Sequence, residues 1–225
     1  DEEEFIKWFS EINNNDVPTV GGKAASLGEM YNNKFPVPMG FVITAQAFNY
    51  FINQMDLKET ISEIIQAVDL EDTEALQKAS LKIRSLIEEK QMPKALKQEI
   101  LESYHILSSE KIETRGISQD ALNILKNSQE PIFVSVRSSA TTEDLVGASF
   151  AGQQDTFLNV RGKENLVENV KKCMSSLFTA RAIYYRQKKG FSNDKSFLAV
   201  VVQKMIDSEK SGVMFSKNPT ESNDN

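Results

Sequence analysis

Residues 132–145 of the chain read IFVSVRSSATTEDL, a strand pattern that gives way to a run of small and hydroxyl residues. The first six residues alternate and are rich in β-branched side chains, which predicts a strand over 132–137. From Ser138 to Thr156 the sequence is dense in Ser, Thr, Ala and Gly, which predicts a long loop. Loops of this length that lack structure of their own are uncommon unless they are functional or disordered.

Arg137 stands where this predicted strand meets the loop. A guanidinium group in that place suits bidentate recognition of a phosphate. Gly147 and Gly152 would let the loop close over a polyphosphate with its amides turned inward. The alternative is a solvated surface loop in which Arg137 pairs with Glu143 or Asp144. The length of the loop favours a functional role.

A second segment, Gly21-Gly22-Lys23, precedes a run of small helix-forming residues. Two glycines before a helix let backbone N–H groups approach a phosphate, and a lysine there adds a positive charge. The segment is not a P-loop, because Val17 and Ala24 occupy positions where that motif needs Gly and Ser or Thr. By itself it is more typical of a plain helix-start turn with a solvated lysine.

A third segment, residues 197–206, is a strongly apolar predicted strand that contains Gln203. An interior glutamine can present its amide to a purine, although a central strand with its polar residues turned away is the commoner case. His105 lies in an amphipathic helical pattern and Cys173 among apolar helix residues, so both are expected to serve packing. The one Cys and one His exclude an intramolecular disulfide and a multi-cysteine or His-rich metal site.

Residues 57–129 form a predicted helical insert in which no residue pattern indicates chemistry. Asp72 is expected to cap one helix, Pro93 to stand in the first turn of the next, and 121–126 to form a third. Elsewhere Thr44 is expected to cap a helix that follows a short buried strand. A long helical pattern over 163–189 is expected to break near Thr179, and 211–216 to pair with the strand at 197–206.

Composition sets broad limits on function. The 225 residues carry a formal net charge of -6, which argues against a protein built to coat nucleic acid or anionic membrane. One cysteine fits a reducing, cytoplasmic compartment, and no apolar run approaches the length of a membrane span. Since the chain starts with Asp1 and ends in a polar tail after a strand pattern, we expect it to be part of a longer protein.

Several segments in order resemble one family, the N-terminal nucleotide-binding domain shared by phosphoenolpyruvate synthase, pyruvate phosphate dikinase and rifampin phosphotransferase. The resemblance covers essentially the whole chain, with the helical insert its loosest part. Within the family, 138–154 is most similar to the synthases and the rifampin enzymes, and least to the dikinases. The matching segments are VGGKAASLGEM at 20–30, VPMGFVIT at 37–44, VSVRSSATTEDL at 134–145, ASFAGQQDTFLNV at 148–160, VQKM at 202–205 and SGVMF at 211–215.

The resemblance implies an α+β, ATP-grasp-like fold in which two lobes hold ATP. Residues 1–200 would form the first lobe, with the insert at about 57–129, and 201–225 would begin an incomplete second lobe. By similarity, Lys23 and Arg137 would contact the ATP phosphates and act in catalysis. Gly152 would lie in the covering loop, Thr156 would hydrogen-bond nearby, and Gln203 would hold the adenine end.

The activity implied by similarity to the synthases converts ATP, pyruvate and water into AMP, phosphoenolpyruvate and phosphate, through a phosphohistidine on a separate domain. The Mg²⁺ ligands of the family lie beyond the last matched strand, and His105 does not stand in its phosphohistidine motif. We therefore expect partner domains for the phosphohistidine and for pyruvate in the full-length protein, and no turnover by these residues alone. The alternatives are a rifampin phosphotransferase and a non-catalytic nucleotide-binding module.

Overall fold

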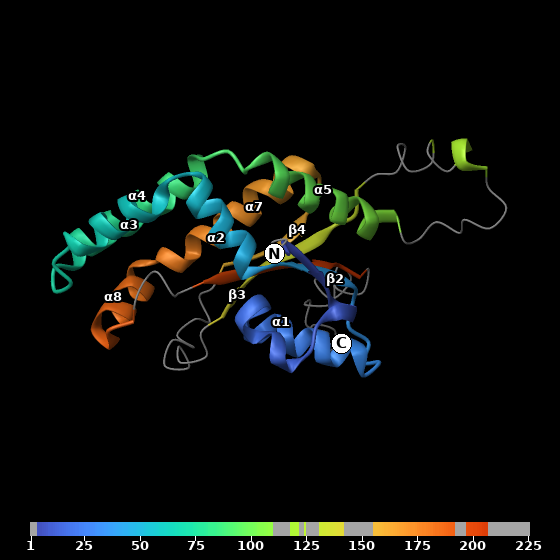
Figure 1. The fold of residues 1–225 in the computed structure, drawn as a ribbon, viewed down its shortest axis with the longest axis horizontal. Helices are drawn as coiled ribbons and strands as arrows, with labels where there is room; N and C mark the ends of the chain where they lie inside the picture. Colours follow the sequence, from blue (N-terminus) through green and yellow to red (C-terminus); the bar gives the residue numbers. More distant parts are fainter. Residues whose placement is uncertain are drawn as a thin grey trace, which may run out of the picture.

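The structure is a computed structural model that describes residues 4–109, 118–121, 124, 131–141, 155–191 and 197–206. Within that part of the chain, five strands form one antiparallel sheet in the order β1-β2-β5-β3-β4 (Figure 1). The strands are β1 (Ile6–Trp8), β2 (Gly40–Ile43), β3 (Val134–Ala140), β4 (Thr156–Val160) and β5 (Leu198–Lys204). Strand β5 therefore lies at the centre of a sheet whose other members come from distant parts of the sequence.

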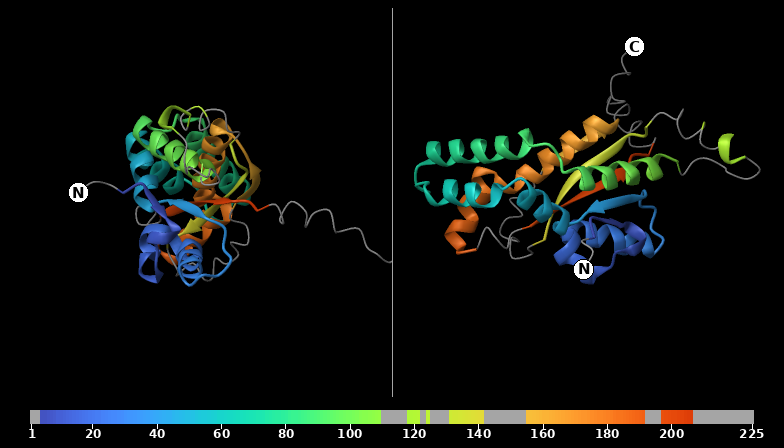
Figure 2. Two further views of the ribbon diagram at one scale, coloured as in Figure 1. Left: turned by 90° about the vertical axis from the view of Figure 1, so that its right-hand side faces the viewer. Right: turned by 45° about the horizontal axis from the view of Figure 1, so that its top comes forward.

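Helices cover both faces of the sheet unequally. Helix α1 lies on one face, and the other face carries a broad layer that includes α2, α4, α5 and α7 (Figures 1 and 2). The described helices are α1 (Val17–Asn32), α2 (Ala45–Gln54), α3 (Leu57–Gln66), α4 (Thr73–Glu89), α5 (Lys94–Ser109), α7 (Lys163–Ser175) and α8 (Ala180–Lys189), with short 3-10 turns η1 (Phe9–Glu11), η2 (Asn14–Asp16) and η4 (Ser176–Phe178). We call these two faces the α1 face and the helical face.

Strand alternation sorts the core between the two faces. On β5, Val200 and Val202 pack in the large core under the helical face, whereas Ala199 and Val201 pack in the smaller core under α1. The helical insert shares the large core, since Ile83 of α4 and Ile100 of α5 are buried in the same cluster. The insert is thus part of one domain core rather than a separate unit.

Several local predictions are confirmed. Thr44 accepts a hydrogen bond from the Ala47 amide at the start of α2, and Asp72 does the same for Ala75 at the start of α4. The long helical pattern breaks at Thr179, whose hydroxyl caps α8. The antiparallel sheet and the helices that pack on it confirm the predicted α+β class.

The strand predicted over 132–137 is displaced in the structure, because β3 runs from Val134 to Ala140. Ser138 and Ala140 pair with Val200 and Leu198 of β5, so backbone pairing keeps extended a stretch whose side chains predicted a loop. The predicted boundary at residue 200 falls inside β5, all of which belongs to the same sheet. The division into two lobes stays a prediction. The expected helix at 121–126 and hairpin strand at 211–216 lie largely or wholly outside the described residues.

Candidate functional site

Arg137 lies in a row of paired residues that crosses the α1 face. Val42 of β2, Val201 of β5, Arg137 of β3 and Thr156 of β4 are successive partners in the sheet. Because directly opposed residues share a face, Arg137 and Thr156 lie side by side on the side that carries α1. Helix α1 packs on β2, β5 and β3, and Thr156 on the edge strand β4 is exposed. The row therefore runs from a covered core to a more exposed end at Arg137 and Thr156, which we call the ledge.

The Arg137 side chain has a buried donor without an acceptor. Its Nε atom is buried, and it makes no hydrogen bond with the residues that the structure describes. Buried donors in proteins are normally paired, and leaving one unpaired costs free energy. An anion that enters the ledge would supply the missing acceptor and a compensating charge.

Lys23 on α1 lies near Arg137 and experiences its charge. Partial burial lowers the pKa of the Lys23 amine, and the neighbouring positive charge of Arg137 lowers it further. No described carboxylate forms an ion pair with either of these side chains. Among the described residues, these two neighbouring cations have no counter-ion, so an anion placed beside them would be favoured.

The turn before Lys23 is built against β3. Gly21 has φ +81°, and a Cβ there would lie 2.2 Å from the Ser139 Oγ and 2.6 Å from its carbonyl oxygen. The Ala24 amide donates to the Ser139 Oγ over 3.3 Å. Helix α1 is kinked at Gly21, and Ser139, two residues along β3 from Arg137, therefore fixes the start of the regular part of α1 that follows this kink. No local pattern indicates this role, because the two partners are 115 residues apart.

Gly22 differs from its neighbour. Its Cβ would meet no atom within 4 Å, and its φ lies outside the left-handed range. Neither local strain nor packing in the structure requires glycine at this position. An open backbone at the start of a helix, next to Lys23, leaves space for an anion to approach the N–H groups.

The remaining predicted site residues lie in different settings. Gln203 is on the α1 face of β5, is largely buried, and donates from Nε2 to the Pro38 carbonyl over 3.1 Å. The Gln203 amide is thus engaged by a backbone carbonyl, and a contact with a purine stays a prediction. Gly152 and the rest of 142–154 lie outside the described residues. Thr156 is the sheet partner of Arg137, and its contact with ATP stays a prediction.

Cys173 and His105 fit the packing roles expected for them. The Cys173 thiol on α7 is buried and directed at the carbonyl oxygens of Val136 and Asp155, each 3.7 Å away. Burial raises the pKa of this thiol, and the Asp155 charge raises it further. His105 is exposed on α5. Neither side chain has the surroundings of a catalytic nucleophile or base.

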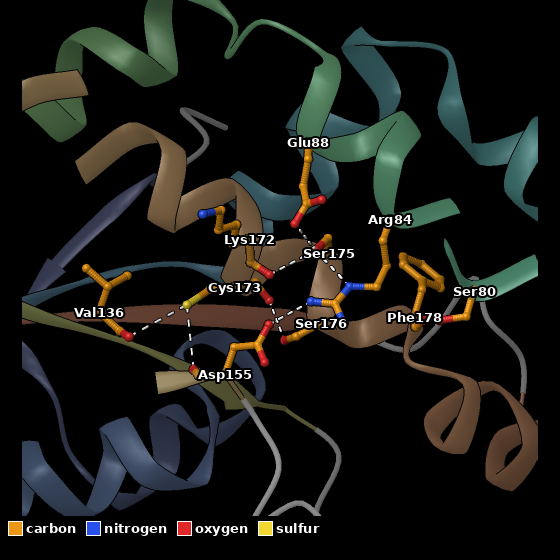
Figure 3. A network of polar contacts seen from close by, with 10 residues as sticks. All are labelled: Ser80, Arg84, Glu88, Val136, Asp155, Lys172, Cys173, Ser175, Ser176 and Phe178. Atoms are coloured by element: carbon orange, nitrogen blue, oxygen red, sulfur yellow. Dashed lines mark hydrogen bonds and ion pairs between the residues drawn. The ribbon is translucent and has the colours of Figure 1, made fainter. Parts of the chain in front are cut away.

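A polar network that sequence reasoning missed lies behind the site, on the helical face (Figure 3). Arg84 of α4 forms an ion pair of 2.7 Å with Asp155, the residue just before β4, and its Nε donates to the Ser175 Oγ over 3.2 Å. Asp155 precedes Thr156 directly, so this network touches the edge of the site. Its members are separated by 71 and 91 residues, which no local pattern could indicate.

Metal ligands and membrane-spanning helices are two further features that bear on function. Among the described residues, no group of three or more His, Cys, Asp or Glu side chains is placed to hold a metal ion. None of the helices in the described ranges is long and apolar enough to cross a membrane.

Comparison with known proteins gives one consistent family. Residues 17–225 match the family model described as the pyruvate phosphate dikinase, AMP/ATP-binding domain. The chain is 50% identical over 223 residues to a probable phosphoenolpyruvate synthase of Methanocaldococcus jannaschii, a match that covers 99% of this chain and 17% of that protein. It is 43% identical to the phosphoenolpyruvate synthase of Pyrococcus furiosus, covering 98% of this chain and 29% of the relative.

A bacterial relative shows the same pattern. The phosphoenolpyruvate synthase of Helicobacter pylori is 44% identical over 218 residues, which cover 94% of this chain and 25% of that protein. The chain thus spans less than a third of each of these relatives. The order of its motifs, its α+β sheet and the family match agree, and the chain belongs to the pyruvate phosphate dikinase AMP/ATP-binding domain family.

Proposed function

We propose that this chain is the ATP-binding part of a phosphoenolpyruvate synthase and that ATP phosphates bind at the ledge formed by Arg137, Lys23 and Thr156. The observation that carries the proposal is the buried Arg137 Nε, which has no acceptor among the described residues and lies near a second unpaired cation. The family description and the names of the relatives support ATP as the ligand. The relatives' names also favour the synthase over the rifampin phosphotransferase.

Each residue of the ledge has a distinct task in this proposal. The guanidinium of Arg137 binds phosphate oxygens in a bidentate manner, whereas the Lys23 ammonium acts as a point charge. The open backbone at Gly22 admits a phosphate close to the N–H groups at the start of the regular part of α1. The Thr156 hydroxyl lies beside Arg137 and donates to the same anion. Gly152 belongs to the loop over the phosphates and Gln203 to the adenine end.

The protein's contribution to phosphoryl transfer at such a site is positioning and charge stabilisation. Arg137 and Lys23 are held by a strand and a helix that Ser139 ties together, so their charges are preorganised before ATP arrives. In the proposed reaction ATP, pyruvate and water give AMP, phosphoenolpyruvate and phosphate, with a histidine of another domain as the first acceptor. His105, which is exposed on α5, is not proposed for that role.

The lobe arrangement is also a proposal. A sheet with one face fully covered and an open ledge on the other suits the first lobe of an ATP-grasp fold, in which a second lobe closes over the ATP. The described residues do not fit a Mg²⁺ site, because the carboxylate next to Thr156 in sequence, Asp155, is engaged by Arg84. We expect the Mg²⁺ that accompanies ATP to take its protein ligands outside the described residues, and no step is assigned to it.

Titration of the 225-residue chain with ATP, followed by NMR, tests the site. We expect weak binding that Arg137→Met and Lys23→Met each reduce by about tenfold or more, the range for a lost charge-assisted hydrogen bond. Exposed cations elsewhere, Lys82 and Arg181, provide the matched controls Lys82→Met and Arg181→Met. Micromolar binding that survives Arg137→Met would show that ATP binds elsewhere.

A second experiment addresses the reaction. The protein expressed from the complete reading frame is expected to form phosphoenolpyruvate from ATP and pyruvate, and the 225-residue chain alone is not. Phosphoenolpyruvate formed by the chain alone would contradict the need for a separate phosphohistidine domain. ATP binding by the complete protein without turnover of pyruvate or a rifamycin would support a non-catalytic nucleotide-binding module instead.

A further inference from the structure

Helix α4 of the insert reaches the edge of the ledge through one ion pair. The Arg84 guanidinium lies 2.7 Å from an Asp155 carboxylate oxygen, and the two side chains are only 25% and 27% exposed (Figure 3). Arg84 is itself held by the Ser175 hydroxyl of α7, which lies 3.1 Å from a Glu88 carboxylate oxygen. Partial burial and a second hydrogen bond make this pair stronger than a typical surface pair.

The backbone of Asp155 is also held in place by contacts with its neighbours. Its carbonyl accepts a hydrogen bond of 3.3 Å from the Ser138 amide, and the Cys173 thiol is directed at the same oxygen. Its side chain points to the helical face, as does Phe157, which packs against the large core. Since successive residues of a strand face opposite sides, Thr156 between them is directed to the α1 face, beside Arg137.

Strand β4 has fewer constraints on its register than the central strand β5 has. It is an edge strand paired only with β3 among the described strands. The pairing shifts between Val134 and Val136, where a bulge places two residues of β4, Leu158 and Asn159, opposite one of β3. Asn159 adopts φ +56°, a left-handed conformation within the bulge. A strand interrupted in this way can slip more easily than a continuous one.

A slip of one residue would change the chemistry of the ledge. Slipped in one direction, β4 would turn Thr156 away and place the Asp155 carboxylate next to Arg137, where it would neutralise the guanidinium; slipped in the other direction, it would place Phe157 there. We infer that Arg84 is a positioning residue for the phosphate site: its ion pair with Asp155 holds β4 in the register that presents Thr156 rather than a carboxylate to Arg137. The inference rests on the proposed function where it concerns ATP, and on the strand pairing where it concerns register.

The test compares two ways of weakening the same helix interface. Arg84→Met removes the contact with Asp155. Ser80→Ala removes the 2.7 Å hydrogen bond from α4 to the Phe178 carbonyl and leaves Asp155 untouched, so it serves as the matched control. Arg84→Lys keeps the charge, and Asp155→Asn weakens the pair from the other side if Arg84→Met does not fold. Register is read from the NMR cross-strand contact between the backbone protons of Arg137 and Thr156, and function from ATP affinity.

We expect Arg84→Met to lose the Arg137–Thr156 contact and to weaken ATP binding by about tenfold, with most of both restored in Arg84→Lys. Ser80→Ala is expected to lower the melting temperature while leaving contact and affinity unchanged. The inference is overturned if Arg84→Met keeps the Arg137–Thr156 contact, or loses this contact without a change in ATP affinity. The same two outcomes apply to Asp155→Asn if that variant is used in its place. If the unaltered chain binds no ATP, the proposed function fails, and the cross-strand contact alone decides whether Arg84 fixes the register.

Discussion

Four cations near the same sheet divide into two kinds. On the helical face, Lys171 of α7 donates to the carbonyls of Glu88 and Lys90 and pairs with Glu168, and Arg84 pairs with Asp155. Near the ledge, Lys23 and Arg137 have no carboxylate partner among the described residues, and the Arg137 Nε lacks any acceptor there. The paired cations hold the helical layer together, whereas the two that have no carboxylate partner among the described residues lie where we propose that an anion binds.

The difference between the two faces concerns stability as well as function. The partners of Lys171 are supplied by the end of α4, so its charge stabilises the folded chain at all times. The surroundings of Lys23 disfavour its charge, as its lowered pKa shows. If Lys23 binds phosphate as proposed, the chain gives up some stability to keep a charge that only the ligand compensates.

The largest effect is expected at the two glycines before Lys23, because Gly21 is required by the fold whereas Gly22 lies open at the proposed site. Gly21→Ala would combine a strained φ of +81° with collision against the Ser139 backbone, and we expect it to cost about 3 kcal/mol of unfolding free energy. Gly22→Ala meets no atom at a helical position, so it is expected to leave the unfolding free energy unchanged or to raise it by up to about 1 kcal/mol while it weakens ATP binding. Urea denaturation measures the unfolding free energy of each variant, and titration measures its ATP affinity. Equal losses of stability in Gly21→Ala and Gly22→Ala would contradict the contrast between the two glycines.

The two lysines provide the next contrast. Lys171→Met leaves two carbonyls and Glu168 without their donor, and we expect a loss of about 1–3 kcal/mol in urea denaturation. Lys23→Met removes a charge that burial and Arg137 disfavour, so its stability at neutral pH is expected to equal or exceed that of the unaltered chain. If Lys23→Met were as destabilising as Lys171→Met, Lys23 would be a structural residue.

A smaller effect is expected in the pH dependence of ATP binding. Phosphates favour the protonated Lys23 amine, so affinity should fall several-fold as pH rises through its lowered pKa, earlier than an ordinary lysine would allow. Removing the positive neighbour in Arg137→Met should raise the Lys23 pKa and move the fall to higher pH. ATP titrations at a series of pH values measure this, with Lys82→Met as control. A profile unchanged in Lys23→Met would assign the titration to another group.

The smallest effect concerns an exposed ion pair. Lys78 and Glu74 are 3.3 Å apart on α4, with side chains 75% and 81% exposed. Glu74→Gln is expected to change the unfolding free energy by less than about 0.5 kcal/mol, because water and salt screen such pairs. Asp155→Asn, which breaks a pair three-quarters buried, should cost more in the same urea series. Similar losses would remove the distinction between structural and surface cations.

Sequence patterns predicted what local chemistry determines. Helix caps at Thr44 and Asp72 and the helix break near Thr179 depend on a residue and its near neighbours, and all three are confirmed. The family followed from long motifs in order.

Long-range contacts escaped prediction for a physical reason. The end of β3 is set by pairing with β5, about 60 residues away, and so the small residues Ser138–Ala140 are strand rather than loop. Ser139 and Arg84 act on partners that are 115 and 71 residues distant. Helical periodicity placed α4 correctly but could not show which of its polar residues meets a strand end.

The central position of β5 has a consequence for synthesis of the protein. Strands β2 and β3 do not pair with each other but each with β5, whose last residue is Lys204. A ribosome therefore releases more than 150 residues after β2 before the strand that joins the halves of the sheet emerges. Helices α3 to α5, with their local contacts, can form early, while β2 and β3 wait with open edges. During that interval the nascent chain is most open to mispairing and to chaperones.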